Sequence, residues 1–529
     1  MNQALRSLVL TPHIERLIDM LQLAEIFQSG MVLQREKPLR VWGRCVPGAA
    51  VTVTVQGNSA ETEADAEGAW SLCLPALSVS ASERLCVQAG EETLCLEDVA
   101  VGEVWIVAGQ SNAEFAMRYE SHLAEVKPGC ANPLIRFYDV PELAFEGQRE
   151  CFDYSSVARW RKADPENIEY FSAVGYYLAR KLSAELSVPV GIVGCNWGGS
   201  VSASWMDPET VRRVGPAWTE AYEAFANSVD WEDYWQRQKT GIQNDRGDLL
   251  HDPFNEFVMP RTRTPEEMGA FAAEMMAKGG LPDIREGEIQ AFHFPGALYE
   301  HMVRPLAPFP VRGVAWYQGE SDDEMHRSGL HQAMLTGLIG DWRRLWGEDL
   351  PFLIVQLPGY ERWLTNEADR YDLIRAAQEA VTRTVKHTWL CSISDVGERY
   401  DIHPKNKLAV GERLALLALG HVYGQAILCD APQFRELEVS GSRLRLCFDH
   451  AEGGLRLLGG AVQDLQVCSG GKAVPFRAEV QGNQLLIVLE EPQTEELEIS
   501  FAQGNYFCVN LLNQAGIPAL PFCCKALPA

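Results

Sequence analysis

No uncharged apolar run in this 529-residue chain approaches the ~18 residues that are needed to cross a bilayer. The amino-terminal segment also lacks the uninterrupted apolar stretch of a secretory signal, because Glu15, Arg16 and Asp19 break its apolar runs. These two absences predict a protein that has no membrane partner and resides in the cytosol.

Positive charge is scarce as well, because 46 Lys and Arg residues stand against 72 Asp and Glu residues. The formal net charge of −26 opposes binding to nucleic acid phosphates and to anionic membrane surfaces. We therefore expect neither of them as a partner. The charge says little about binding of a neutral sugar.

The fourteen cysteines include no pair at the CxxC spacing of a typical zinc site. Cys86, Cys95 and Cys447 lie inside alternating, strand-like segments, where a free cysteine acts as a small apolar side chain. Cys523 and Cys524 are adjacent, which is an awkward geometry for a structural disulfide. Without a secretory signal, we expect the thiols to be mostly reduced.

The length of the chain predicts about three or four domains. After an extension, 1–23, residues 24–99 alternate apolar and polar positions between turns, which predicts a small antiparallel β module. Residues 426–529 show the same alternation. Between them, in 100–425, apolar runs alternate with amphipathic helices, as is typical of a parallel α/β sheet. Residues 207–295 interrupt this pattern and predict an insertion or lid.

The α/β pattern predicts strands and helices at definite positions. The expected strands are 104–108, 188–194, 311–317, 352–356 and 389–393, and the expected helices are 171–186, 330–345, 373–384 and 408–419. Ligands of such sheets bind at the carboxyl ends of the strands. Clusters of glycine and hydrogen-bonding residues follow these strands, in GQSN (109–112), NWGGS (196–200), WYQGESD (316–322) and SDVGERYDIHPKNK (394–407).

GQSN places a serine, Ser111, where a buried strand ends. One interpretation is a turn, since Gly, Ser and Asn all favour turns. The other is a nucleophile, which needs a base to accept its proton and a third group to orient that base. His403 is the best candidate base, because it lies in a loop late in the α/β unit, beside Asp401.

An acyl-transfer site also needs hydrogen-bond donors that face the developing oxyanion. The backbone N–H of Ser111 is one candidate, and Gly199 allows close approach of a second backbone N–H. Gln318 offers a side-chain amide. The alternative interpretation is that Gly198 and Gly199 only form a turn and that Gln318 only caps a helix.

The motifs GQSN, WGGS, WYQGES and DIHPKNK, in this order, resemble the sialate O-acetylesterase family of the SGNH-type hydrolases. FQSGMVLQREKPLRVWG, LIRAAQ and KLAVGERLALLALG extend the likeness over most of 24–425. The resemblance implies a flavodoxin-like parallel sheet with flanking β-sandwich-like modules. It also implies an esterase that removes O-acetyl groups from sugars, most notably 9-O-acetylated sialic acids, without a metal or another cofactor.

The resemblance further implies that Ser111 is the nucleophile and His403 the general base, with Gly199 and Gln318 joining the Ser111 amide in the oxyanion hole. Asp401 is our choice for the residue that orients His403.

This choice departs from the pattern of many SGNH-type enzymes, which place the acid three residues before the histidine. Tyr400 occupies that position here. Asp395, Glu398 or a backbone carbonyl therefore remain as alternatives to Asp401.

Five side chains near these motifs are expected to contact the sugar. They are Gln110, Asn112, Trp197, Trp316 and Arg375. The two tryptophans suit stacking on a pyranose, although buried aromatic residues more often belong to the core. The guanidinium of Arg375 suits the carboxylate of a sialic acid, and the alternative is an ion pair with an internal carboxylate.

Three other functions stay open at this point. The same machinery suits other acetylated glycans, such as acetylated xylan. A non-catalytic carbohydrate-binding protein would share the two β modules. A metal site built from His403, Asp395, Glu398 and Asp401 is a weaker option. The expected assembly is a monomer or a homodimer.

Overall fold

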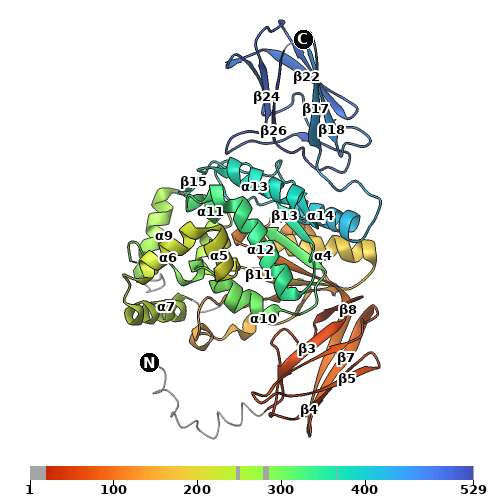
Figure 1. Ribbon diagram of the computed structural model, residues 1–529, viewed down its shortest axis with the longest axis vertical. Helices are drawn as coiled ribbons and strands as arrows, with labels where there is room; N and C mark the ends of the chain where they lie inside the picture. The colour runs from red at the N-terminus through yellow and green to blue at the C-terminus, as the bar shows by residue number, and fades with distance from the viewer. Residues whose placement is uncertain (1–19, 246–250, 278–284, 365, 528–529) are drawn as a thin grey trace.

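The structure is a computed structural model that describes residues 20–245, 251–277, 285–364 and 366–527. Residues 1–19 of the expected extension therefore lie outside the described residues. Figure 1 shows an α/β unit in the middle, a red-orange β module at one end and a blue β module at the other. The predicted fold class, an α/β core with flanking β modules, is confirmed.

The central sheet has the strand order β10-β9-β11-β8-β12-β13-β16. Its strands are β8 (Glu92–Gly109), β9 (Asn132–Asp139), β10 (Arg161–Ala163), β11 (Val190–Asn196), β12 (Gly313–Tyr317), β13 (Phe352–Val355) and β16 (Thr388–Cys391). All pairings from β9 to β16 are parallel, and β10 is antiparallel to β9. The five expected strands are present within a few residues, whereas β9 and β10 were not predicted.

Helices cover both faces of this sheet. The main ones are α4 (Ala173–Leu186), α12 (His331–Trp346), α13 (Tyr371–Thr384) and α14 (Lys407–Leu417). Side chains of α4 and α14 share a core with Trp105 and Val107 of β8. Side chains of α12 share the opposite core with Val104 and Ile106, because successive strand residues point to opposite faces. Within the described part of the chain, no helix is both long and apolar enough to span a bilayer.

Strand β8 connects the first β module to the α/β sheet. Its first part pairs with β7 and β2, and from Glu103 onward it pairs with β11 and β12. The expected boundary near residue 100 thus lies inside one continuous strand. The other strands of this module are β1 (Gln22–Leu23), β2 (Val32–Gln34), β3 (Leu39–Arg44), β4 (Ala50–Val55), β5 (Asn58–Glu63), β6 (Ala69–Leu74) and β7 (Ser80–Ala89).

The insertion between β11 and β12 is helical. The insertion contains α5 (Pro208–Val214), α6 (Pro216–Ala226), α7 (Trp231–Asp245), α8 (Pro253–Val258) and α9 (Pro265–Ala277).

The second β module has two four-stranded sheets. One sheet contains β17 (Gln433–Ser440), β18 (Arg443–Asp449), β23 (Gln484–Leu489) and β22 (Phe476–Gln481). The other contains β21 (Lys472–Ala473), β20 (Leu465–Ser469), β24 (Leu497–Phe501) and β26 (Phe522–Ala526).

The expectation of reduced thiols is wrong for Cys86 and Cys95, which form a disulfide. The two residues lie directly opposite each other on β7 and β8, with their Cα atoms 4.2 Å apart. This pairing depends on the register of the hairpin, which the alternation of the sequence does not reveal. The other twelve cysteines are free in the structure.

Candidate active site

Ser111 lies at the carboxyl end of the central sheet, where β8 ends and the short helix α2 (Ser111–Glu114) begins. The preceding Gly109 has φ +135°, and a Cβ at this position would lie 2.0 Å from the carbonyl oxygen of Tyr317. Only glycine therefore allows β8 to approach β12 this closely. The turn that follows places Ser111 between the ends of β11 and β12.

His403 lies in the loop between β16 and α14, and its Nε2 is 2.9 Å from the Oγ of Ser111. The ring of Phe115 stacks against the imidazole, with the centroids 6.4 Å apart. The ring of Trp363 contacts the imidazole edge-on at 4.9 Å. The structure thus brings together the nucleophile and the base that the sequence predicted, and two aromatic rings confine the base.

Asp401 is the carboxylate nearest to the other ring nitrogen of His403. Its Oδ1 accepts the backbone N–H of His403 at 2.9 Å and lies 3.7 Å from Nδ1. Its Oδ2 lies 2.9 Å from the Nζ of Lys405. The buried Nδ1 has no hydrogen-bond partner among the described residues. Asp401 is therefore close to the ring but too far for a direct hydrogen bond.

The two alternative carboxylates have other partners. Asp395 forms a bidentate ion pair with Arg413, at 2.6 and 2.7 Å. Glu398 accepts the backbone N–H of Lys405 at 3.1 Å. Of the three candidates, Asp401 is thus the one that the structure places beside His403.

Burial holds the pKa of His403 well below its ordinary value of 6.5, and the nearby ammonium groups of Lys405 and Lys407 lower it further. A neutral imidazole is the form that can accept a proton from Ser111. The environment of His403 thus favours the form that a general base requires.

We predict from this pKa shift that kcat/KM for an acetyl ester stays constant as the pH falls through 6.5. Its acid limb is expected well below that pH, because the ring stays neutral until its depressed pKa is reached. The Lys405→Met variant removes one ammonium group, so its acid limb should move to higher pH. A wild-type acid limb at or above pH 6.5 would contradict this reasoning. The measurement is a pH profile of kcat/KM for both proteins.

The loop that follows β11 carries Gly199, and hydrogen bonds hold this loop on two sides. The backbone N–H of Gly198 donates to the Oε2 of Glu114 at 2.7 Å. The Nε2 of His293, from the insertion, donates to the carbonyl of Gly199 at 2.8 Å. Gly199 has φ +73°, which glycine adopts readily. The sequence pattern does not indicate these roles of Glu114 and His293.

Two backbone N–H groups of this region are available to bind an oxyanion. Among the described residues, the N–H groups of Ser111 and Gly199 have no hydrogen-bond partner. The buried amide of Gln318 lies nearby, with Nε2 3.4 Å from the Ser200 carbonyl and 3.3 Å from the Oδ1 of Asp322. The three predicted oxyanion donors therefore come from the ends of three neighbouring strands, β8, β11 and β12.

The predicted substrate contact of Trp316 is wrong, because this side chain is fully buried. It packs edge-to-face against Trp205 and Trp342 in the core. Trp197 is only partly buried, and its ring stacks on Phe292 of the insertion with the centroids 5.0 Å apart. One face of Trp197 is thus occupied by the protein itself.

Gln110 and Asn112 are also buried, and both bind within the protein instead of facing a sugar. The Oε1 of Gln110 accepts the backbone N–H groups of Gly319 and Ser321. The Nδ2 of Asn112 donates to the carbonyl of Ile402 at 2.9 Å. The amides on either side of Ser111 therefore fix the loops around it.

Arg375 is likewise not a substrate contact. Its buried guanidinium donates to the carbonyl of Gly504 and lies over the ring of Phe507, both from the second β module. Burial lowers the pKa of Arg375 to about 10. Helix α13 thus presents this side chain to the domain junction, which the helical spacing of the sequence could not reveal.

A buried polar network lies behind Ser111, and it includes Lys407, whose role the sequence does not indicate. Asn112 donates to the Oε1 of Glu320 at 2.7 Å and accepts from the Nζ of Lys407. Burial raises the pKa of Glu320 to about 7 and lowers the pKa of Lys407 to about 7. Through Asn112, the network joins the nucleophile turn to the loop that carries His403.

A cavity of about 140 Å³ opens beside Ser111, between the ends of β9 and β11 and helix α8. Its lining includes four carboxylates, from Glu114, Asp139, Glu142 and Asp252, and one guanidinium, from Arg118. Burial raises the pKa of Asp139 to about 6, and its carboxylate forms an ion pair with Arg161, so the other three carboxylates carry most of the negative charge of this lining.

Arg118 does not offset this acidic lining, because its Nη1 donates to Glu256 at 2.9 Å. Its guanidinium also lies 4.4 Å from the centroid of the Tyr170 ring. The charge of Arg118 is thus already paired inside the protein.

Comparison with known proteins gives a consistent result. The family model for carbohydrate esterases described as sialic acid-specific acetylesterases matches residues 275–419. Over 465 residues, the chain is 26% identical to the mouse sialate O-acetylesterase, covering 80% of this chain and 78% of that protein. The human sialate O-acetylesterase is 24% identical, with 76% and 71% covered.

A solved structure shares the whole architecture. A carbohydrate acetylesterase from Xanthomonas citri is 28% identical, and the match covers 96% of this chain and 99% of that one. The TM-score is 0.71. The likeness thus includes both β modules in addition to the central sheet.

Proposed function

We propose that this chain is a carbohydrate esterase of the sialic acid-specific acetylesterase family and that it removes O-acetyl groups from sugars through Ser111 and His403. The observation that carries this proposal is the 2.9 Å contact between the Oγ of Ser111 and the Nε2 of His403. Two open backbone N–H groups stand beside this contact at the carboxyl end of the sheet. These are the parts that acyl transfer requires.

In the proposed reaction, the Nε2 of His403 accepts the proton of Ser111 as Oγ attacks the acetyl carbonyl. The oxyanion lies against the N–H groups of Ser111 and Gly199, and the Gln318 amide is the third donor. The carbon–oxygen bond to the sugar then breaks, and His403 returns the proton to the sugar oxygen. Water that is deprotonated by the same ring then attacks the acetyl-serine. The bond between the acetyl carbon and Oγ breaks, His403 returns the proton to Oγ, and acetate leaves.

Asp401 supports this cycle in the proposal. A carboxylate near Nδ1 stabilises the imidazolium that forms when His403 accepts a proton. The 3.7 Å separation between its Oδ1 and Nδ1 leaves only a small side-chain rotation before a hydrogen bond forms. The ion pair between Asp401 and Lys405 competes with that bond.

Two classes of sugar have support from different observations. The mouse and human relatives are named sialate O-acetylesterases, which supports O-acetylated sialic acid as a substrate, and 9-O-acetylated sialic acid is the form we propose. The acidic lining of the cavity beside Ser111 instead favours a neutral acetylated glycan. A sugar carboxylate near one of these side chains experiences roughly 1 kcal/mol of repulsion or more.

We predict from this charge that 9-O-acetylated sialic acid is a poorer substrate than its methyl ester, by about five- to tenfold in kcat/KM at low salt. Acetate release from both compounds, and from acetylated xylo-oligosaccharides, is the measurement. Asp252→Asn removes one negative charge and keeps a side chain that caps α8. This variant should therefore narrow the difference in kcat/KM between the methyl ester and the free acid.

The outcomes test the esterase activity and the class of sugar separately. Acetate release from none of these sugars would contradict the esterase function itself. A preference for the free carboxylate over its methyl ester would contradict the neutral-glycan assignment and leave the sialic acid assignment in place.

A further inference from the structure

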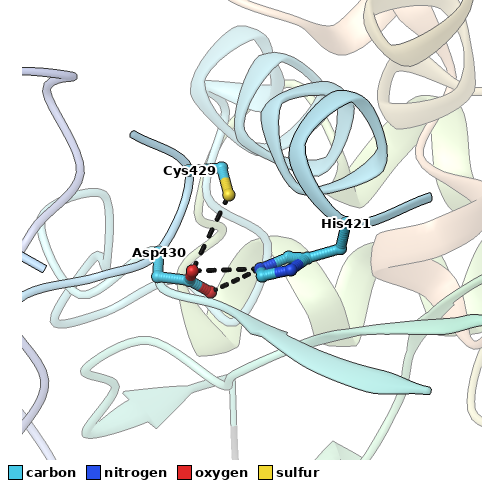
Figure 2. Close-up of side chains that lie close together, drawn as sticks. All are labelled: His421, Cys429 and Asp430. Atoms are coloured by element: carbon cyan, nitrogen blue, oxygen red, sulfur yellow. Dashed lines mark hydrogen bonds and ion pairs between the residues drawn. The ribbon is translucent and has the colours of Figure 1, made fainter. Parts of the chain in front are cut away.

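A second cluster of reactive side chains lies where the α/β unit meets the second β module. Figure 2 shows His421, Cys429 and Asp430 pointing toward one another. The Nε2 of His421 is 2.9 and 3.0 Å from the two carboxylate oxygens of Asp430. The Sγ of Cys429 is 3.7 Å from Oδ2 of the same carboxylate. His450 lies at the edge of this group, with its Nδ1 3.9 Å from that Oδ2.

Imidazole, thiolate and carboxylate groups are the ligands of protein-bound zinc. Tetrahedral bonds of about 2.0 Å to nitrogen or oxygen and about 2.3 Å to sulfur separate neighbouring ligand atoms by about 3.3–3.5 Å. The ligand atoms of His421, Cys429 and Asp430 all lie within 4.8 Å of one another, and those of His421 and Cys429 are 2.9 and 3.7 Å from the Asp430 carboxylate. Shifts of about 1 Å would therefore bring these three side chains to a shared ion, and the partly exposed side chain of His450 would rotate toward it as the fourth ligand.

The surroundings of the cluster hold its members in place. The Nδ2 of Asn513 donates to the backbone carbonyls of Asp430, at 2.9 Å, and His450, at 3.1 Å. The ring of Trp389 stacks on His421, with the centroids 4.8 Å apart. A Cβ at Gly420 would lie 2.4 Å from the Sγ of Cys429, so glycine makes room for the thiol. Metal ligands are typically oriented by outer contacts of this kind.

We propose that His421, Cys429, Asp430 and His450 form a structural site for a divalent transition-metal ion, with zinc as the preferred metal. His421 belongs to the π-helical turn η10 (Ala418–Val422) after α14, and His450 follows β18 of the second β module. The ion joins the α/β unit to that module. Binding releases the proton of the Cys429 thiol to solvent, because the thiolate is the ligand.

The sequence did not indicate this cluster, because its four residues do not follow the CxxC spacing of a typical zinc site. Here two ligands, Cys429 and Asp430, are adjacent, and the histidines lie 8 residues before Cys429 and 20 residues after Asp430. None of the four lines the cavity beside Ser111. The proposed ion therefore has no part in ester hydrolysis.

The test is titration of the full-length, metal-free protein with Zn²⁺ and, separately, with Co²⁺. We expect one ion per chain and, for Co²⁺, a thiolate-to-metal charge-transfer band. In Cys429→Ser this band should disappear, and the affinity for Zn²⁺ should fall at least tenfold. Cys468→Ser is the matched control, because Cys468 is a partly buried free cysteine of the same β module, and it should bind as the wild type does.

A second variant covers the case in which Cys429→Ser fails to fold. The side chain of His450 is 44% exposed, so His450→Ala should fold and should bind Zn²⁺ about tenfold more weakly. Zn²⁺ should also raise the Tm of the wild type and leave its kcat/KM for acetyl esters unchanged. Absence of saturable binding to the wild type, or a Co²⁺ band that persists in Cys429→Ser, would show only a His421–Asp430 ion pair beside a buried thiol.

Discussion

Ser111→Ala is expected to lower kcat/KM for p-nitrophenyl acetate by at least about 10⁴-fold. The substitution removes the Oγ that attacks the acetyl carbonyl and leaves the backbone donors of the oxyanion hole in place. Residual hydrolysis then relies on those donors and on substrate binding alone. The measurement is the rate of p-nitrophenol release, followed by acetate release from an acetylated sugar.

The control for this prediction is Ser228→Ala. Ser228 is an exposed serine of the insertion whose Oγ donates only to the Phe225 carbonyl. Its variant should match the wild type within about twofold. If Ser111→Ala kept wild-type activity, Ser111 would be a turn residue and the nucleophile would lie elsewhere.

His403→Ala is expected to lower kcat/KM by about 10³–10⁴-fold, because Ser111 then has no base to accept its proton. The space that the ring leaves between Phe115 and Trp363 suits a free imidazole molecule. Added imidazole should therefore restore part of the activity in a concentration-dependent way. Loss of a purely structural histidine would not be rescued in this way.

The matched control is His326→Ala, since His326 is exposed and pairs with Asp369 at 2.9 Å. This variant should keep full activity. A small effect of His403→Ala, comparable to that of His326→Ala, would exclude His403 as the general base.

The sequence predicted the core strands and the residues at their ends because both depend on local pattern. Ser111 and His403 are 292 residues apart, yet both follow buried strands of one parallel sheet. Parallel strands place their carboxyl ends along one edge. This rule, together with the resemblance of the motifs to a known esterase family, predicted that the two side chains meet.

Side-chain direction after the strand ends was not predictable in the same way. Asn112 turns inward to Glu320 and Lys407, and Trp316 packs into the core, although both belong to the motifs. Their directions depend on the packing of helices and loops that are distant in sequence. Arg375 illustrates the same limit, because its partners lie in the second β module.

Strand register and strand composition account for two other differences between the predictions from the sequence and the structure. The Cys86–Cys95 bond depends on which residues of β7 and β8 are opposite each other. Strand β9, with the sequence NPLIRFYD, contains a proline and a buried Arg136 and so lacks the apolar run typical of a parallel strand. The guanidinium of Arg136 donates to the backbone carbonyl of Gly30 at 2.9 Å, which the strand sequence alone does not indicate.

The most direct test of the proposed chemistry is to locate the acetyl group during turnover. The protein would be mixed with p-nitrophenyl acetate, whose good leaving group makes deacylation the slower step, and then quenched in acid. Peptide mass spectrometry should find one acetyl group on Ser111 in the wild type and none at that position in Ser111→Ala. An acetyl group on a different residue that turns over at the rate of hydrolysis would contradict acyl transfer through Ser111.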